Sequence, residues 1–355
     1  MKSRFLLAAT SIALLTTLGA AFSVLEVYAQ SADLRELPAR SIPVPDTVSP
    51  QLQKMIAVPV RPNWRDFPKT AEEWKKLVDA LAAAAVQTLP ALREQLHVKT
   101  EATTIDGVPT FIVTPEAIPP ENRNRLLIHV HGGCYVLFPG ESGTIEAIFM
   151  AGFGHFKVIS VDYRMPPTAP YPAALDDAMT VWKAVVKMVP PTNLAVFGSS
   201  AGGALTLSMV LRAKQENLPL PAAIAPGTPM SDLTGRGDSF ATNALLDNVL
   251  IAYGVSCDAG AALYANGRDL KDPLLSPIYG DVHGFPPTIL TTGTRDLLLS
   301  NTVRMHRKLR LAGVEAALQV FEGMAHGQYF GDPAAAESKE AFEEIAGFFD
   351  RHLGK

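Results

Sequence analysis

The chain has 355 residues, of which 48% are hydrophobic and 19% charged, so it can bury a large core and is not a disordered protein. Its formal net charge of −4, with no run of lysine or arginine, argues against nucleic acid as a partner. Two cysteines cannot build a disulfide framework, and neither a Cys-x-x-Cys nor a His-Glu-x-x-His motif is present for a metal. We therefore expect one large α/β domain or two smaller ones.

Residues 1–29 have the layout of a secretory signal peptide. Lys2 and Arg4 precede an uncharged stretch, 5–25, and short residues lead to Ala29, after which we expect cleavage. The alternative is an uncleaved membrane anchor, because the stretch is nearly long enough to span a bilayer. Its serine and threonine residues weaken that alternative. We expect export to the periplasm or the medium, with no stable membrane insertion after cleavage.

Residues 30–95 are expected to form an N-terminal arm followed by a cap helix. The segment 31–68 contains seven prolines and few apolar runs, which is typical of an extended arm. Thr70 begins a capping box, in which a threonine and a glutamate three residues later satisfy the first N–H groups of a helix. Apolar residues then recur at helical spacing, which predicts an amphipathic helix over 71–89.

From residue 96 onward, short apolar runs alternate with helical stretches. This alternation predicts a mostly parallel, doubly wound α/β sheet of eight strands with helices on both faces. The first two strands meet at Asp106-Gly107, a hairpin signal. The expected strands are 97–104, 108–114, 125–130, 157–162, 193–198, 222–227, 287–293 and 316–321, and the expected helices lie near 172–188, 201–215, 301–312 and 336–352.

The segment 230–276 breaks this alternation, because it contains no convincing strand. It has two pieces of helical character, 243–253 and 258–264. We expect an insertion that packs with the N-terminal helix as a cap over the carboxyl edge of the sheet. The insertion would divide the core into the parts 96–229 and 277–355.

The run Gly198-Ser199-Ser200-Ala201-Gly202 lies between an expected strand and an expected helix. The G-x-S-x-G pattern alone is weak, but strand, sharp turn and helix are the setting of a nucleophile elbow. The glycines leave room for a tight turn on which a serine hydroxyl stands clear of the backbone. We predict that Ser200 is a nucleophile and that the N–H of Ala201 faces a developing oxyanion.

Two adjacent glycines supply the other expected oxyanion donors. Gly132 and Gly133 follow the buried strand 125–130 and precede the expected elbow in the chain. They let the backbone turn its N–H groups into a cavity, where donors fixed in advance stabilise the charge of acyl transfer. A lone Gly-Gly pair is more often a hairpin turn, but this pair lies at the carboxyl end of a strand. We expect an oxyanion hole made by Gly132, Gly133 and Ala201.

A serine nucleophile needs a base and an acid that orients the base. His326 follows the last expected strand in a loop with glycines on both sides, where its imidazole can reach over the sheet edge. Asp296 follows the strand 287–293, so the chain order is Ser, Asp, His, as in α/β-hydrolases. Asp272 and Asp281 are the alternatives for the acid, but neither directly follows a strand. The remaining histidines are expected to be structural, peripheral or solvated: His97, His129, His131, His155, His283, His306 and His352.

Over roughly residues 100–350 the chain resembles the hormone-sensitive-lipase-type esterases of the α/β-hydrolases. The resemblance implies an α/β-hydrolase fold with a helical cap, no cofactor, and a Ser200–His326–Asp296 triad that hydrolyses carboxylic esters. The residues that carry it are His131-Gly132-Gly133, Asp162-Tyr163-Arg164, Tyr171-Pro172-Ala173-Ala174-Leu175-Asp176-Asp177, Gly198-Ser199-Ser200-Ala201-Gly202-Gly203, Ser276-Pro277, Phe285-Pro286-Pro287-Thr288 and Gly323-Met324-Ala325-His326.

The chain departs from the family on the substrate side of the site. Cys134 stands where the family often has a third glycine, and Ser199 stands where the family usually has Asp or Thr. We expect Cys134, Tyr135 and Ser199 to contact the substrate, whose identity these departures leave open. Cys134 and Cys257 are expected to be free, since buried free cysteine is common. A disulfide between them in an oxidising compartment is the alternative.

The expected reaction is a two-step acyl transfer. The base takes the serine proton, the alcohol leaves, and water then hydrolyses the acyl-enzyme. We expect a small-molecule ester with a short to medium acyl chain, because the cap segments offer apolar groups but no charged patch. Lactones, aryl esters and amides or peptides are alternative substrates, and a binding protein that has lost its triad is the non-enzymatic alternative. A homodimer is left open.

Overall fold

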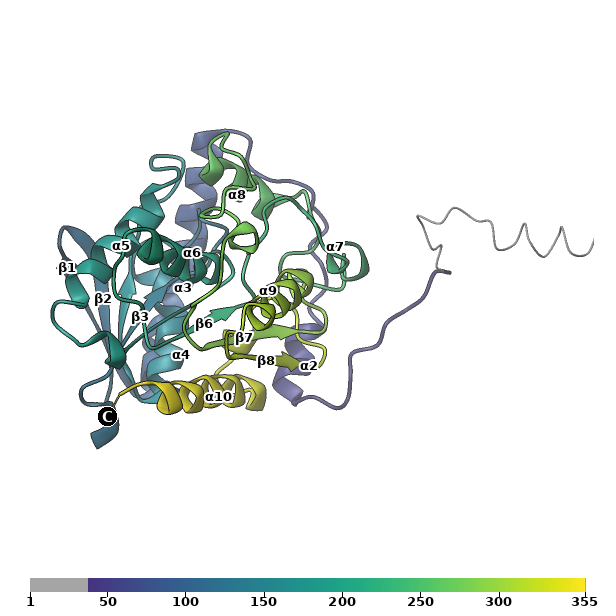
Figure 1. Ribbon diagram of the computed structural model, residues 1–355. Helices are drawn as coiled ribbons and strands as arrows, with labels where there is room; N and C mark the ends of the chain where they lie inside the picture. The colour runs from purple at the N-terminus through teal and green to yellow at the C-terminus, as the bar shows by residue number, and fades with distance from the viewer. Residues whose placement is uncertain (1–37, 355) are drawn as a thin grey trace, which may run out of the picture. The chain divides into compact units, whose positions relative to one another are not determined.

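The computed structural model describes residues 38–354, so the expected signal segment lies outside the described residues. The chain divides into two units, Met1–Pro43 and Val44–Lys355, and every element and contact below belongs to the second. That unit is built around an eight-stranded sheet whose strands run in the order β1-β2-β4-β3-β5-β6-β7-β8 (Figure 1). Within the described residues, no helix combines the length and the apolar character that crossing a membrane requires.

The sheet is parallel except at one end. β1 pairs antiparallel with β2 and β2 with β4, and the pairs from β4 through β3, β5, β6 and β7 to β8 are parallel. The carboxyl ends of the parallel strands therefore meet at one edge, as in other open α/β sheets. The strands are β1 Val98–Ile105, β2 Val108–Pro115, β3 Leu126–Val130, β4 Lys157–Val161, β5 Leu194–Ser199, β6 Ala223–Gly227, β7 Thr288–Gly293 and β8 Ala316–Phe321.

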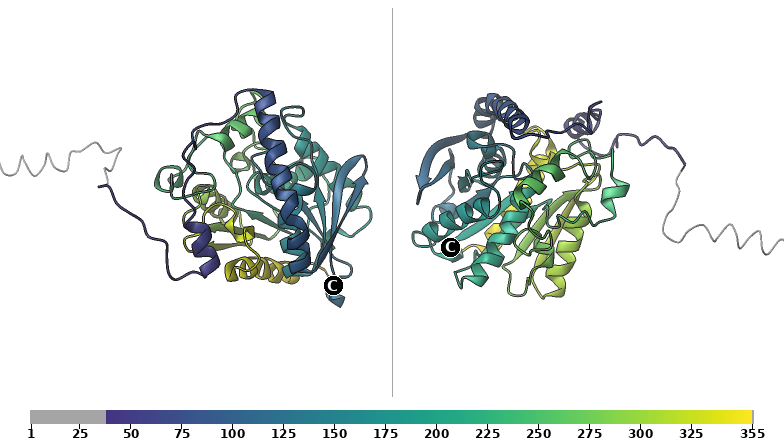
Figure 2. Two further views of the ribbon diagram at one scale, coloured as in Figure 1. Left: turned by 180° about the vertical axis from the view of Figure 1, so that it is seen from behind. Right: turned by 90° about the horizontal axis from the view of Figure 1, so that it is seen from above.

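Helices cover both faces of this sheet and bury two separate cores. Successive residues of a strand point to opposite faces, and in β3 Leu127 belongs to one core while Ile128 and Val130 belong to the other. The first core is shared with α4 and α10, and the second with α5, α6 and α9 (Figure 2). The helices are α2 Pro50–Ile56, α3 Ala71–Leu96, α4 Ile145–Gly154, α5 Ala173–Val185, α6 Ala201–Gln215, α7 Ser239–Thr242, α8 Ser256–Ala265, α9 Leu299–Leu311 and α10 Ala336–His352.

The N-terminal segment contains more helix than its sequence predicts. The expected arm includes the short helix α2, which Ser49 caps by accepting the N–H of Leu52. α3 begins with the expected capping box at Thr70 but continues past residue 89 to Leu96, through Pro90. Apolar burial on one face continues through that extension, which keeps the helix packed on the core. From behind, α3 runs as a long dark-blue helix across the molecule (Figure 2).

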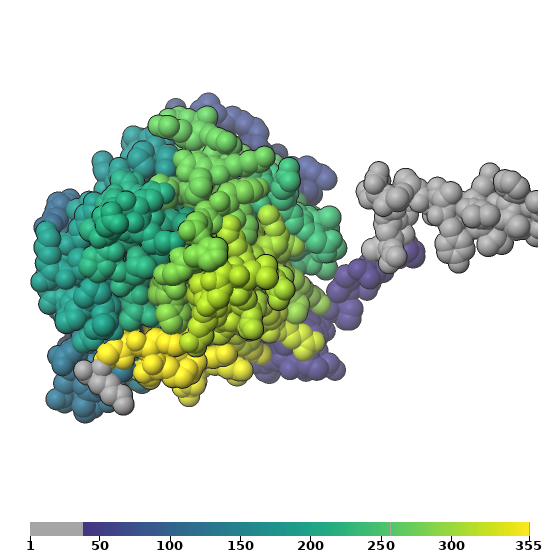
Figure 3. Space-filling view, viewed as in Figure 1, coloured from purple at the N-terminus to yellow at the C-terminus, as the bar shows by residue number. Residues whose placement is uncertain are grey.

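The segment 230–276 lies between β6 and β7 and contains α7 and α8 but no strand. In Figure 3 its green surface extends from the top of the molecule, where α8 lies, to the right-hand side, where α7 lies (Figure 1). α8 corresponds to the second expected helical piece, whereas the expected helix over 243–253 is wrong. There Leu245 and Ile251 have φ values of +64° and +71°, which a helix does not allow. The Asp247 side chain also binds backbone N–H groups of its own loop, in competition with helical hydrogen bonds.

Candidate active site

Ser200 stands on a sharp turn between β5, which ends at Ser199, and α6, which begins at Ala201. Its φ and ψ of +61° and −122° are strained for a residue with a side chain. Neighbouring backbone holds it there, because the Ser200 N–H donates to the Gly227 carbonyl (2.9 Å) and the Ser200 carbonyl accepts from Met230 (3.0 Å). Two backbone hydrogen bonds, to the last residue of β6 and to the segment that follows it, therefore hold Ser200 in this strained conformation.

The two glycines of the elbow are required by a close approach to β3. A Cβ atom on either Gly198 or Gly202 would lie 2.0 Å from the Val130 carbonyl oxygen. No other residue allows β5 and α6 to pack this closely against β3. The close packing carries Ser200 to the edge where β3 ends and the two-glycine loop begins.

Gly132 and Gly133 lie directly beside the elbow. A Cβ on Gly132 would be 3.3 Å from the Ser200 Cβ, and Gly133 has a φ of +108° that suits glycine. Ala201 is the first residue of α6, so its N–H has no acceptor within the helix. The structure thus places Gly132 and Ala201, two of the three expected oxyanion donors, next to Ser200, and Gly133 follows Gly132 in the same loop.

The loop that carries these glycines is held from below by two aromatic residues. His131 stacks on Tyr163 with ring centroids 4.1 Å apart, and the Tyr163 hydroxyl donates to the His131 carbonyl (2.6 Å). Burial lowers the pKa of His131 to about 3, so its ring is neutral at ordinary pH. Its role is to hold the loop, and Tyr163 is a supporting residue whose function the sequence did not reveal.

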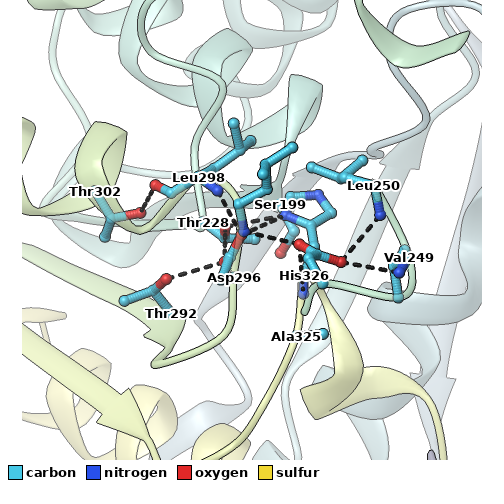
Figure 4. A network of polar contacts seen from close by, with 12 residues as sticks. Ser199, Thr228, Val249, Leu250, Thr292, Asp296, Leu298, Thr302, Ala325 and His326 are labelled. Carbon is cyan, nitrogen blue, oxygen red and sulfur yellow. Dashed lines mark hydrogen bonds and ion pairs between the residues drawn. The ribbon is translucent and has the colours of Figure 1, made fainter. Parts of the chain in front are cut away.

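Asp296 and His326 meet at the same edge of the sheet, after β7 and β8 respectively. His326 Nδ1 lies 3.1 Å from Asp296 Oδ1 (Figure 4). The hydroxyls of Thr292 (2.9 Å) and Thr228 donate to the other carboxylate oxygen, and the Leu298 N–H donates to Oδ1 (2.8 Å). Thr228 directly follows β6, so the carboxyl ends of β6, β7 and β8 all contribute to this pair.

The electrostatic surroundings set the protonation of His326, whose side chain is 7% exposed. Burial alone would lower the pKa of His326, but the carboxylates of Asp296, Asp247 and Glu146 outweigh burial and raise that pKa. With Nδ1–H donating to Asp296, the neutral ring leaves Nε2 as an acceptor. This is the tautomer that a base for a serine hydroxyl needs.

Ser199 does not face a substrate, contrary to expectation. Its side chain is fully buried beneath the elbow, and its N–H donates to Glu146 (3.0 Å). The Ser199 hydroxyl contacts both Glu146 and the Tyr329 hydroxyl, and His129 Nε2 lies 3.3 Å from Glu146 Oε2, the oxygen that also accepts the Ser199 N–H. Successive side chains point to opposite sides of the backbone at the end of β5, so Ser199 points into the core where Ser200 points out of it.

Cys134 and Tyr135 lie beneath the cap instead of standing free in a pocket. Cys134 forms a disulfide with Cys257 of α8, with Cα atoms 5.1 Å apart, so the expectation of free cysteines is wrong. Tyr135 is 2% exposed and stacks on Tyr264 with centroids 4.1 Å apart. The insertion brings α8 back to the loop that carries Gly132 and Gly133, and in this way two cysteines that are 123 residues apart in sequence meet.

The two alternative acids lie away from this pair. Asp281 binds the side chains of His283 and Lys214, and Asp272 caps its own turn by accepting the Leu274 N–H. Within residues 38–354, no group of three or more metal-ligating side chains could hold a metal ion. At the sheet edge, the Asp296–His326 pair and the serine turn are groups that can carry out acid–base and nucleophilic chemistry.

Comparison with known proteins finds esterases and a family with the alpha/beta hydrolase fold. Residues 127–330 match a family described as having the alpha/beta hydrolase fold. An esterase of Acinetobacter venetianus is 31% identical over 232 residues, which cover 64% of this chain and 75% of that protein. The crystal structure of an esterase E25 is 43% identical, with a TM-score of 0.88, over 91% of this chain and all of that one. An esterase from the bacterial hormone-sensitive lipase family is 25% identical, with a TM-score of 0.67, over 81% of this chain and all of that one.

Proposed function

The chain belongs to the hormone-sensitive-lipase-type esterases of the α/β-hydrolase family and hydrolyses carboxylic esters, and from this premise we propose that it does so by acyl transfer to Ser200. The observation that carries the proposal is the Asp296–His326 pair, with 3.1 Å between Oδ1 and Nδ1, at the edge where the Ser200 elbow stands. The proposed mechanism uses no metal ion and no cofactor.

In the proposed mechanism His326 Nε2 removes the Ser200 proton as Oγ attacks the ester carbonyl. Asp296 holds the ring in the required tautomer and stabilises the imidazolium that forms. The N–H groups of Gly132, Gly133 and Ala201 bind the oxyanion, each contributing about 3 kcal/mol to the transition state. His326 then returns the proton to the leaving alcohol, and water attacks the acyl-enzyme by the reverse sequence.

We propose esters with short to medium acyl chains as the substrates. The groups next to the oxyanion glycines on the cap side are apolar, namely the Cys134–Cys257 disulfide and the stacked pair of Tyr135 and Tyr264. Their attachment to α8 keeps the cap close to the acyl-binding side of the site. A long lipid chain would need the cap to lie farther from the loop.

We also propose that the protein is exported. The signal-like layout of residues 1–29 supports export, and the buried disulfide supports an oxidising compartment. Expression of the full chain, followed by fractionation and N-terminal sequencing, tests this. We expect mature protein that begins at Gln30 outside the cytoplasm, whereas an intact N-terminus in the membrane fraction would indicate an anchor.

The test of the proposed chemistry is turnover of p-nitrophenyl acetate, butyrate, octanoate and laurate. We expect the shorter esters to be the best substrates and Ser200→Ala to lose at least about 1,000-fold in kcat. Ser208→Ala is the matched control, since Ser208 lies on the same helix and donates only to the Leu274 carbonyl (3.0 Å). A serine-directed phosphonate should label Ser200, as shown by peptide mass spectrometry. Full activity of Ser200→Ala would overturn the mechanism, and laurate as the best substrate would replace the substrate class.

A further inference from the structure

A loop of the cap reaches inward to the two loops that carry Asp296 and His326. The loop runs through residues 243–251 and turns back on itself, with the Leu245 N–H donating to the Ile251 carbonyl (2.7 Å). Both residues have positive φ, and bulky side chains make this conformation costly. Such strain persists only where other contacts hold the loop, and those contacts converge on Asp247.

The Asp247 carboxylate is fully buried and accepts four backbone N–H groups from three segments. Oδ1 accepts from Val249 (2.8 Å) and Leu250 (3.0 Å) within the cap loop. Oδ2 accepts from Leu297 (2.7 Å) and more weakly from His326 (3.4 Å). One of these residues follows Asp296 directly and the other is the base itself. One side chain therefore links the cap to both members of the Asp296–His326 pair, and Figure 4 shows Val249 and Leu250 beside that pair.

The flanking amides of the same loop reinforce this attachment. Asn243 Nδ2 donates to the backbone carbonyls of Thr294 (3.1 Å) and Asp296 (2.8 Å). Asn248 Oδ1 accepts from the side-chain Nε2 of Gln328 (3.1 Å), two residues beyond His326. The cap loop thus donates to the backbone around Asp296 and accepts from a side chain close to His326.

We propose that Asp247 is a positioning residue for the triad. Its carboxylate joins the backbone of the Asp296 loop to that of the His326 loop, and this link holds the side chains of Asp296 and His326 in the relative positions that the reaction needs. This inference rests on the proposed catalytic roles of Asp296 and His326. It makes the cap insertion part of the machinery that aligns the base. Asp247 acts through the backbone N–H groups of Leu297 and His326.

The carboxylate is suited to this position in a way that an amide is not. Both oxygens of Asp247 face N–H donors, two on each side, so an asparagine would turn its own NH2 group toward one of those pairs. Asp247→Asn therefore preserves volume but breaks one side of the link. The loops would then relax, and misplacement by about 1 Å can cost on the order of 100-fold in rate.

The test compares kcat and KM of Asp247→Asn with those of the parent enzyme on p-nitrophenyl butyrate. We expect kcat to fall between about 10- and 100-fold and KM to stay within about twofold, because the proposed role of Asp247 is to align Asp296 and His326 and not to bind substrate. Labelling of Ser200 by a small phosphonate should slow by a similar factor. Asp258→Asn is the matched control: this cap carboxylate also accepts a backbone N–H, from Gly254 (2.6 Å), but binds neither loop. Its kcat should be unchanged.

Three results would overturn the inference: an unchanged kcat in Asp247→Asn, a rise in KM alone, or an equal loss in Asp258→Asn. If Asp247→Asn does not fold, as judged by circular dichroism, Asp247→Glu replaces it. The added methylene keeps the charge but displaces the linked loops, so kcat should again fall at constant KM. Failure of the proposed function would be separate, since Ser200→Ala and His326→Ala would then remain active.

Discussion

The disulfide between Cys134 and Cys257 is expected to be a large contributor to stability. Replacing both cysteines by alanine removes the cross-link without burying an unpaired hydroxyl, since the two side chains are 8% and 7% exposed. The bond closes a loop with a sequence separation of 123, for which the lost conformational freedom of the unfolded chain amounts to about 5 kcal/mol. Measured values usually fall below this limit, so we expect the free energy of unfolding to drop by about 3–5 kcal/mol.

Urea unfolding, followed by far-ultraviolet circular dichroism and by loss of ester turnover, measures this difference. The variant without the cross-link should unfold at lower urea concentration and with a steeper dependence, because its unfolded chain exposes more surface. Thiol titration of the parent in denaturant should find no free thiol before reduction and two after it. One free thiol pair before reduction, or a stability change below about 1 kcal/mol, would refute the reasoning.

Three further predictions concern the elbow, the base and the loop support. Gly202→Ala should abolish folding or activity, because its Cβ would lie 2.0 Å from a β3 carbonyl. Gly347→Ala on α10, whose Cβ would meet only the Arg351 side chain at an ordinary 3.9 Å, should instead stabilise the helix by about 0.5–1 kcal/mol. Thermal melting of both variants checks this. Burial lowers the pKa of His326, but the facing carboxylates raise it by more than burial lowers it. The acid limb of kcat/KM should therefore lie above pH 6.5, and a limb below that value would contradict the effect of these carboxylates on His326. Tyr163→Phe removes a buried 2.6 Å hydrogen bond to the oxyanion loop and should cost about 1–3 kcal/mol in unfolding free energy together with a lower kcat.

The sheet was predictable from the sequence because its strands are short apolar runs bounded by turn residues. Each of the eight expected strands begins and ends within one residue of an observed strand. α4 was missed for a physical reason: Ile145–Gly154 is apolar nearly all round and buried, so it has no amphipathic period to detect. Glu146, on that helix, was therefore missed as well, although it lies directly beneath the nucleophile turn.

The site was predictable only where a residue lies in the loop that follows the carboxyl end of a strand. Ser200 follows β5 directly, Asp296 lies three residues after β7, and His326 lies five residues after β8. Parallel strands bring such loops to one edge of the sheet. Thr228 follows β6 in the same way and could have been found by the same rule. Asp247 has no comparable signal. Its partners, Leu297 and His326, lie 50 and 79 residues away, and Asp247 binds their backbone N–H groups, which nearly every residue type provides.

The cap insertion is attached at two places to the segments that carry the proposed site residues. Cys257 ties α8 to Cys134, which follows Gly133, and Asp247 ties the preceding loop to the backbone of Leu297 and His326. A rigid movement of the whole insertion would have to break the disulfide or displace the loops of Asp296 and His326. Substitutions at either attachment, at Cys257 or at Asp247, should therefore lower kcat before they alter acyl preference.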